Sequence, residues 1–324
     1  MDHYEDLIPA YLRFVKGVVD SSDLPLNVSR EILQKNAQIE IIKKNVTKKI
    51  LDTLKELKDS DYEKYLRFYQ EFGKVLKEGI HFDLSHREAI SELLLFPSTK
   101  TEQGKLETIP DYVKEMKEGQ EEIYYITGTS VDDTLKSPYL EAFKEKGFEV
   151  FLMLDEVDDI ILNHFEYKGK KFKSVIKGDI TLDKTEKAEK EKAEKKYSKL
   201  IDLIKGRLKN DLKDVRFSSR LKDSVCCLVG DEGAIDPHME KLLKSMGQNV
   251  PESKRILEIN ASHPLFEAMN SMFEKDSGNK VLEEYIDMLY EQALLLEGSK
   301  PKDISNFTKV ITKLMKENLS HDIK

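Results

Sequence analysis

The 324-residue sequence is poor in cysteine and proline and has no long apolar run. Its two cysteines, Cys226 and Cys227, are adjacent and cannot close an ordinary disulfide loop. We expect two buried thiols in a strand, in a reducing compartment. No apolar run approaches the roughly 20 residues of a bilayer-spanning helix, and the N-terminus lacks a signal-peptide pattern. These absences predict a cytoplasmic protein with no membrane partner.

The sequence also lacks the compact motifs of common enzymes. Its 15 glycines are scattered and form neither a G-x-x-x-x-G-K-[ST] nor a G-x-G-x-x-G phosphate loop. The seven histidines show neither an H-E-x-x-H motif nor a Cys/His ligand spacing. Gly128 and Ser130 lack the G-x-S-x-G context of a nucleophile elbow. We therefore expect no metal site and no cofactor in this chain, and a stand-alone hydrolase is disfavoured.

Charged residues are abundant, at 35% of the chain, and the formal net charge is −8. A dedicated nucleic-acid-binding protein is normally basic, so we expect no nucleic-acid partner. With only 9 prolines, this composition favours a soluble, helix-rich protein. The length allows two or three domains with sizeable cores.

The hydrophobic pattern predicts a mixture of helices and strands. Residues 11–19 are apolar and β-branched and resemble a short strand, whereas 30–58 and 61–97 have helical periodicity. Between 109 and 154 the order helix, strand, helix, strand predicts a small α/β/α unit. Glu and Lys recur at i,i+4 in 185–196, which favours a solvated helix over the alternative of a flexible charged linker. The remaining predicted elements are a helix at 158–164, a hairpin at 165–175 and strands at 215–218 and 224–229.

Residues 236–247 have the pattern of a capped amphipathic helix. Asp236 suits the N-cap position, and Gly247 can close the helix. The apolar residues have i, i+3, i+4, i+7 spacing and are Met239, Leu242, Leu243 and Met246. Such a stripe packs in many protein cores, but methionine also suits adaptable binding surfaces. Core packing and partner contact both remain open.

Two more amphipathic patterns, joined by a Gly-Ser-Lys-Pro turn, predict a helical hairpin near the end of the chain. The first stripe contains Leu282, Ile286, Leu289 and Ala293. The second contains Phe307, Val310, Ile311 and Leu314. One such hairpin could bury both faces within its own domain.

Arg30 is out of place in a predicted helix start. Asn27 and Ser29 suit a helix cap, and Glu31 suits the positive end of the helix dipole. A cation in the first turn costs from a few tenths up to about 1 kcal/mol. Either a group outside the helix uses Arg30, or it is an ordinary solvated arginine.

Several segments resemble bacterial members of the heat-shock protein 90 chaperone family, the HtpG type. They are found in 11–34, 72–79, 111–128, 137–141, 146–150, 246–251 and 257–260. The resemblance extends over almost the whole chain and implies a helix-rich, multidomain fold of the α/β and α+β classes. It assigns 1–98 to the end of the large middle subdomain with a helical coil, and 99–182 to a small α/β/α middle subdomain. Residues 183–324 would be a C-terminal α+β domain that ends in the helical hairpin. We expect the family's N-terminal ATP-binding domain to be missing.

The resemblance also implies functional residues. Arg30 would reach the γ-phosphate of ATP held by the N-terminal domain, and Gln34, one turn later, would support it. The stripe of Met239, Leu242, Leu243 and Met246 would contact unfolded or partly folded clients. The hairpin residues Leu282, Ile286, Leu289, Ala293, Phe307, Val310, Ile311 and Leu314 would form a homodimer.

The expected function is therefore that of the middle and C-terminal portion of an ATP-dependent chaperone clamp. The full-length parent would bind ATP and magnesium, and this chain alone would have no ATPase activity. The alternative is an ATP-independent holdase or dimeric scaffold that is complete as it stands.

Overall fold

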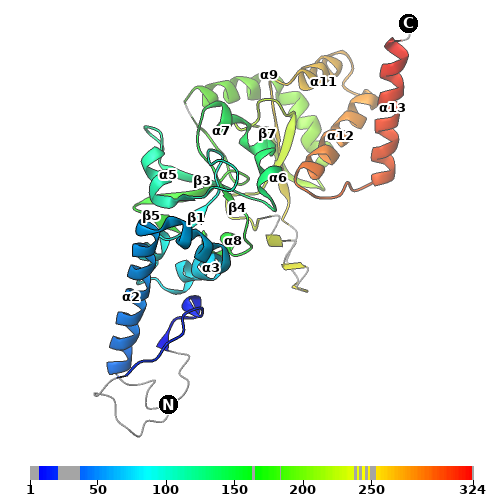
Figure 1. The fold of residues 1–324 in the computed structure, drawn as a ribbon. Coiled ribbons are helices and arrows are strands. Elements are labelled where there is room, and N and C mark those ends of the chain that lie inside the picture. The colour runs from blue at the N-terminus through cyan, green and yellow to red at the C-terminus, as the bar shows by residue number, and fades with distance from the viewer. Residues whose placement is uncertain are drawn as a thin grey trace. The chain divides into compact units, whose positions relative to one another are not determined.

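The computed structural model describes residues 7–20, 37–162, 165–182, 184–236, 239–240, 243–244, 247–248 and 253–322 (Figure 1). The chain divides into two compact units. Unit 1 consists of Met1–Ile123 and Phe151–Phe172, and unit 2 consists of Tyr124–Val150 and Lys173–Lys324. These limits differ from the three predicted domain ranges, which stay a prediction. The predicted helix-rich fold with α/β and α+β parts is confirmed.

Two long consecutive helices, α2 (Ala37–Ser60) and α3 (Tyr62–Phe82), dominate unit 1. Asp61 separates them, and its side chain accepts a hydrogen bond from the backbone N–H of Lys64 (3.1 Å). This bond caps α3 and fixes the point where the second helix begins. Unit 1 also contains η2 (Ala10–Leu12), α4 (Arg87–Ser91), β1 (Leu95–Phe96), β2 (Glu107–Thr108), α5 (Ile109–Glu115), β4 (Phe151–Met153), α8 (Asp158–Ile161) and β5 (Glu166–Tyr167).

The strand predicted at 11–19 is wrong. Ala10–Leu12 form the 3₁₀ helix η2, and residues 15–20 have no regular structure. Tyr11 and Leu12 are buried, whereas Val18 is 99% exposed. β-Branched residues favour a strand only where neighbouring strands and a packed face receive them, and Val18 has no such environment.

A buried lysine organises the core of unit 1. Lys77 of α3 is only 3% exposed and pairs with Asp155 (2.8 Å) and Asp158 (2.7 Å). Its ammonium also lies 4.6 Å from the centre of the Phe96 ring. Burial raises the pKa of Asp158. A charge is stable at such a depth only when it is paired, so Lys77 fixes the connection between β4 and α8 onto α3.

A four-stranded sheet has the order β4-β3-β6-β5, with β3 at Glu122–Thr127 and β6 at Lys170–Ser174. The division between the units falls within β3 and β6. The predicted hairpin is confirmed: β5 and β6 are antiparallel, with Tyr167 opposite Lys170. Lys168 (φ 48°) and Gly169 (φ 78°) form its two-residue turn. Positive φ at both positions is the requirement of a type I′ turn.

Unit 2 is built on a three-stranded sheet of order β7-β9-β8. The strands are β7 (Leu212–Phe217), β8 (Cys226–Val229) and β9 (Arg255–Ile259). β7 runs parallel to β9, and β8 runs antiparallel to it. Because side chains alternate across a strand, one face of the sheet collects apolar residues. They are Val215, Phe217, Cys226, Leu228, Leu257 and Ile259.

Helices cover this apolar face of unit 2. The core includes residues of α9 (Lys184–Leu208), α11 (Pro264–Lys275) and α12 (Lys280–Leu296). The helix predicted at 185–196 is confirmed as part of α9. The predicted buried thiols are confirmed too, since Cys226 and Cys227 lie fully buried in β8. Unit 2 also contains α6 (Val131–Leu135), η3 (Pro138–Leu140), α7 (Glu141–Glu145) and α13 (Ile304–Asp322).

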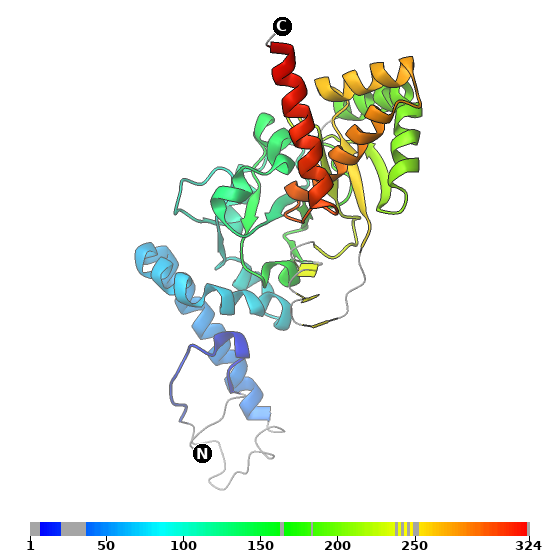
Figure 2. The same cartoon turned by 90° about the vertical axis from the view of Figure 1, so that its right-hand side faces the viewer.

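The last helix is attached differently from the others. In Figures 1 and 2, α13 extends from the turn after α12 and does not cover the sheet.

None of the helices within the described ranges has the length and hydropathy of a bilayer-crossing segment.

Candidate functional site

The predicted nucleotide-contact residues Arg30 and Gln34 lie outside the described residues. The same holds for Leu242 and Met246 of the predicted client stripe. The roles of these four residues stay predictions. The other predicted site residues lie in unit 2.

The described part of 236–248 has helical residues at 239–240 and 243–244. The backbone N–H of Glu240 donates to the carbonyl of Asp236 (2.8 Å), and the Asp236 side chain accepts a hydrogen bond from Thr127 (2.7 Å). Gly247 has φ +78°, the left-handed conformation typical of a helix end. Met239 and Leu243 are partly buried, so neither core packing nor partner contact is excluded for them.

An ion-pair chain fastens this segment to the rest of unit 2. Glu240 is buried and pairs with Lys244 (2.8 Å) and Arg255 (2.8 Å), and Arg255 also pairs with Glu297 (2.8 Å) at the end of α12. Burial acts to raise the pKa of Glu240, but the bonds from Lys244 and Arg255 outweigh it and hold this pKa below its ordinary value. The polar side of the segment is thus held by charge.

The first half of the predicted hairpin is part of a core. The stripe residues of α12, which are Leu282, Ile286, Leu289 and Ala293, are buried in unit 2 together with residues of the sheet. The Cys226 thiol also donates to the carbonyl of Leu289 (3.2 Å). Unit 2 itself covers this stripe, and the predicted role of these four residues in a dimer stays a prediction.

The second half of the hairpin, α13, has solvent-exposed apolar side chains. Ile311 is 36% exposed and Met315 is 61% exposed. The predicted residues Phe307, Val310 and Leu314 are partly buried. Further exposed apolar side chains belong to α13 and to the end of α12: Ile304, Leu319, Leu295 and Leu296. An apolar surface of this kind is typical of an interaction site.

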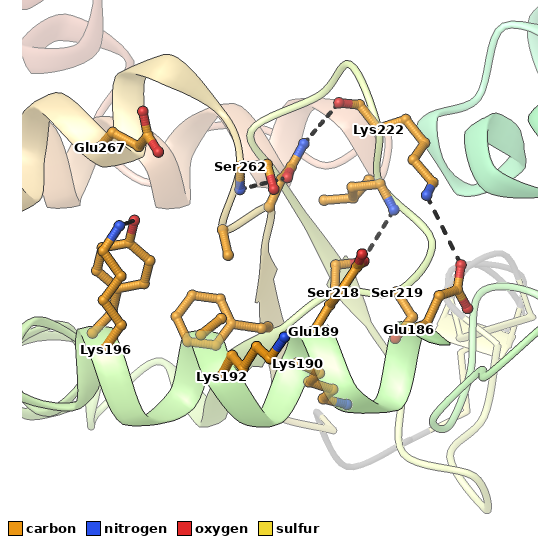
Figure 3. Close-up of a pocket in the computed structure, with 16 residues that line it drawn as sticks. Glu186, Glu189, Lys190, Lys192, Lys196, Ser218, Ser219, Lys222, Ser262 and Glu267 are labelled. Carbon is orange, nitrogen blue, oxygen red and sulfur yellow. Dashed lines mark hydrogen bonds and ion pairs between the residues drawn. The ribbon is translucent and has the colours of Figure 1, made fainter. Parts of the chain in front are cut away.

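A polar groove of about 420 Å³ lies between α9 and the segments that follow β7 and β9. Figure 3 shows lysines of α9 on one side and Lys222 and Ser262 on the other. Lys222 pairs with Glu145 (3.0 Å), and Lys190 pairs with Asp179 (2.9 Å). Because much of its charge is already paired, the groove favours no single ligand class.

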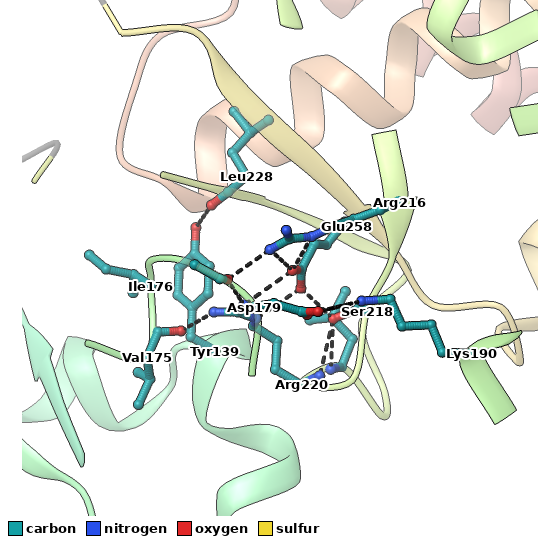
Figure 4. Close-up of polar contacts among 12 residues, drawn as sticks. Tyr139, Val175, Ile176, Asp179, Lys190, Arg216, Ser218, Arg220, Leu228 and Glu258 are labelled. Atoms are coloured by element: carbon teal, nitrogen blue, oxygen red, sulfur yellow. Dashed lines mark hydrogen bonds and ion pairs between the residues drawn. The ribbon is translucent and has the colours of Figure 1, made fainter. Parts of the chain in front are cut away.

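A buried polar cluster lies on the opposite face of the unit 2 sheet (Figure 4). Glu258 of β9 accepts hydrogen bonds from Arg220 (2.8 Å) and Arg216 (2.8 Å). Arg220 is fully buried and also donates to the carbonyls of Val175 and of Gly178 (2.6 Å for Gly178). All three charged side chains thus have partners, as buried charges must. The cluster joins the sheet to the segment that leads into α9.

Sequence reasoning missed this cluster. One signal was present: Glu258 interrupts the apolar run Ile256–Ile259. A carboxylate at a central strand position needs a buried partner. Nothing in the sequence identified Arg220 as that partner, because the two are far apart along the chain.

No described group of three or more His, Cys, Asp or Glu residues could hold a metal ion. Among the described residues of unit 2, the features above are ion-paired charges and, on α13 and the end of α12, exposed apolar side chains.

Comparisons with known proteins identify the family. A family model described as "Hsp90 protein" matches residues 1–324. The chain is 51% identical over 320 residues to the chaperone protein HtpG of Geobacter metallireducens, and 50% identical over 320 residues to that of Geobacter sulfurreducens. It is 43% identical over 324 residues to that of Streptomyces coelicolor. The matches cover 97%, 97% and 98% of this chain but 49%, 49% and 51% of the relatives. The chain spans about half the length of these relatives, and it belongs to the Hsp90 family.

Proposed function

We propose that this chain supplies the client-contact and dimerisation surfaces of an ATP-dependent Hsp90-type chaperone in the cytoplasm. Family membership supports the chaperone class. The observation that carries the proposal is the exposed apolar surface of α13 and the end of α12. A soluble chain gains by covering such a surface.

The proposed homodimer is formed by α13. Ile311 and Met315 lie one helical turn apart and therefore on the same side of α13, and both are exposed. Two copies related by a two-fold axis would pack these faces together as a four-helix arrangement with the two α12 helices. The stripe of α12 would contribute indirectly, by holding the hairpin on its own unit.

The proposed client surface is the segment 236–248. Met239 and Leu243 are only partly buried, while Glu240 and Arg255 fix the segment from its polar side. A segment held by charge leaves its apolar side chains available for varied partners, and methionine suits that use.

Sedimentation of the chain tests the dimer. We expect a dimer for the wild type and a monomer for Ile311→Glu/Met315→Glu, because two buried carboxylates would oppose the interface. Asn306→Glu introduces the same charge at an exposed position of α13 away from this face and should leave the dimer intact. A dimeric double variant would contradict the proposed interface.

Client contact is tested by suppression of aggregation of a heat-unfolded reporter protein. Replacement of Met239 by serine should weaken suppression and leave the unfolding temperature of the chain almost unchanged. A fall of several degrees in the unfolding temperature with unchanged suppression would assign Met239 to the core.

For the nucleotide step, we propose that Arg30 contacts the γ-phosphate, with Gln34 in support. An arginine offers a permanently charged, planar fork for phosphate oxygens. The chain joined to an ATP-binding domain of the family should lose about 10²-fold or more in ATPase rate on Arg30→Ala, with nucleotide still bound. An unchanged rate would make Arg30 an ordinary surface cation.

A further inference from the structure

A cavity of about 360 Å³ in unit 1 has a lining rich in lysine. It lies among the end of α2, the start of α3, the start of α5 and the β5–β6 turn. Its described lining contains the lysines Lys55, Lys58, Lys114 and Lys168 and the carboxylates Asp59, Glu92 and Asp111. The lining therefore has one positive charge in excess, whereas the whole chain has a net charge of −8.

Two of the three carboxylates are already engaged. Glu92 pairs with Lys55 (2.6 Å), and this hydrogen bond is the main cause that lowers the pKa of Glu92. Asp111 pairs with Lys114 (2.8 Å) and accepts a hydrogen bond from the Thr108 hydroxyl (2.6 Å). Its pKa is lowered as well, first by the bond from Lys114. Both groups are therefore ionised and neutralised by other partners.

Lys58 lacks this compensation. It is half-buried, and its ammonium donates to the backbone carbonyl of Glu92. No carboxylate of the described chain lies within ion-pair distance of it. Burial lowers the pKa of Lys58 and outweighs the opposing attraction of Asp59, Asp111 and Glu92, none of which forms an ion pair with it. An ammonium has three N–H donors, so Lys58 retains unused hydrogen-bonding capacity.

The Tyr167 hydroxyl is the second uncompensated group. Tyr167 is 2% exposed and lines the cavity, and its hydroxyl has no hydrogen bond of normal geometry among the described residues. Lys168 lies 4.9 Å from the centre of the Tyr167 ring, and its attraction to the hydroxyl raises the pKa of Lys168. A lysine can only donate, however, so the O–H proton of Tyr167 still has no acceptor.

We propose that this cavity binds a small oxyanion of the phosphate class, either inorganic phosphate or a phosphate monoester, through Lys58 and Tyr167. The missing group must accept hydrogen bonds from both residues and carry negative charge. A phosphate supplies several acceptor oxygens and charge together, and charge-assisted hydrogen bonds are the strongest of their kind. Water would accept from Tyr167 but would not neutralise Lys58. Lys168, which shares Glu92 with Lys55 at a longer distance (3.8 Å), is a further cation of the lining. This inference does not rest on the proposed chaperone function.

Calorimetric titration of the whole chain with inorganic phosphate, at constant ionic strength, tests the site. We expect saturable binding with one site per chain, and a rise in unfolding temperature that saturates with it. Tyr167→Phe removes only the hydroxyl, and Lys58→Met keeps the length of the side chain. Each should weaken binding by at least about tenfold, the effect of one charge-assisted hydrogen bond. Lys49→Met is the control, because Lys49 is an exposed lysine of α2 outside the cavity.

A second titration with glycerol 3-phosphate identifies the source of the phosphate group. Tighter binding than that of inorganic phosphate would indicate a phosphorylated metabolite, and weaker binding would indicate the free anion. Either result supports the site if Lys58→Met and Tyr167→Phe both weaken the binding. Absence of saturable binding, or equal binding by wild type and Tyr167→Phe, would overturn the proposal and leave a cavity filled by water alone.

Discussion

The helices α12 and α13 have similar apolar stripes but different surroundings. Leu282 and Ile286 of α12 are fully buried, whereas Ile311 and Met315 of α13 are 36% and 61% exposed. An amphipathic pattern thus shows that a helix has an apolar face to cover. It does not show whether the cover comes from the same domain or from another molecule.

The sheet of unit 2 explains the difference. The stripe of α12 packs on the face that carries Cys226 and Leu228, where core side chains surround it. α13 follows a short turn and has no sheet to pack on. Ion pairs near the surface help to hold it, such as Lys313 with Glu284 (2.7 Å). Surface pairs of this kind are worth about 0–1 kcal/mol.

The largest expected effect is the contrast between matched truncations in the two helices. Ile286→Ala should lower the free energy of unfolding by about 2–5 kcal/mol, because it leaves a cavity in a closed core. Ile311→Ala should change it by about 0.5 kcal/mol or less in the monomer. Urea unfolding at low protein concentration measures both. Equal losses would mean that α13 is as much a part of the core as α12.

Amide hydrogen exchange should separate the helices next. The amides of α12 should exchange only with opening of the unit 2 core, whereas those of α13 should exchange earlier through local opening. In the proposed dimer, protection of α13 should rise with protein concentration. If α13 were as protected as α12 at every protein concentration, neither local opening of α13 nor its protection by dimerisation would hold.

A smaller effect is expected for the ion pairs that hold each helix. Arg207 of α9 makes two hydrogen bonds to Asp287 of α12 (2.7 and 2.6 Å) and one to Glu283 (2.7 Å). Arg207→Ala should lower the free energy of unfolding by about 1 kcal/mol, the upper range for exposed pairs. Lys313→Ala, which removes the ion pair of α13 with Glu284 of α12, should lower the free energy of unfolding by less. Double-mutant cycles with Asp287→Ala and Glu284→Ala isolate the two pair energies.

The smallest effect is a pH dependence at the far end of α12. The pKa of Glu240 is lower in the folded state than its ordinary value of 4.5. Its ion pairs therefore add stability at pH values above 4.5, and this contribution is lost as the pH falls through the lowered pKa. Glu240→Gln should flatten the acid side of the stability profile and leave α13 exchange unchanged. An identical profile for wild type and variant would show that Glu240 contributes nothing to this slope.

Local patterns predicted much of the fold. The i,i+4 charges of 185–196 predicted the helix that is part of α9, and the local sequence of 165–175 predicted the β5–β6 hairpin. Both signals depend on neighbours within a few residues. The strand predicted at 11–19 failed because residue type alone does not provide a neighbouring strand.

The candidate sites were less accessible to sequence reasoning. The parallel pairing of β7 with β9 brings Arg216 opposite Glu258 across some forty residues, and no local pattern encodes that register. The lysines around Tyr167 come from α2, α5 and the β5–β6 turn, so only the tertiary fold gathers them. Whether the apolar stripe of α12 or of α13 is buried likewise depends on which helix packs on the sheet.

The adjacent thiols of β8 can report how often the core of unit 2 opens. Burial raises the pKa of Cys226 to about 12, and burial also raises the pKa of Cys227. Neither thiol therefore reacts while the sheet is closed. Their modification by a thiol reagent would report how often β8 separates from α12, because Cys226 donates to Leu289 of that helix. Labels can therefore be placed on new surface cysteines without removing Cys226 and Cys227. Any slow reaction of these two native thiols measures the rate at which the core of unit 2 opens.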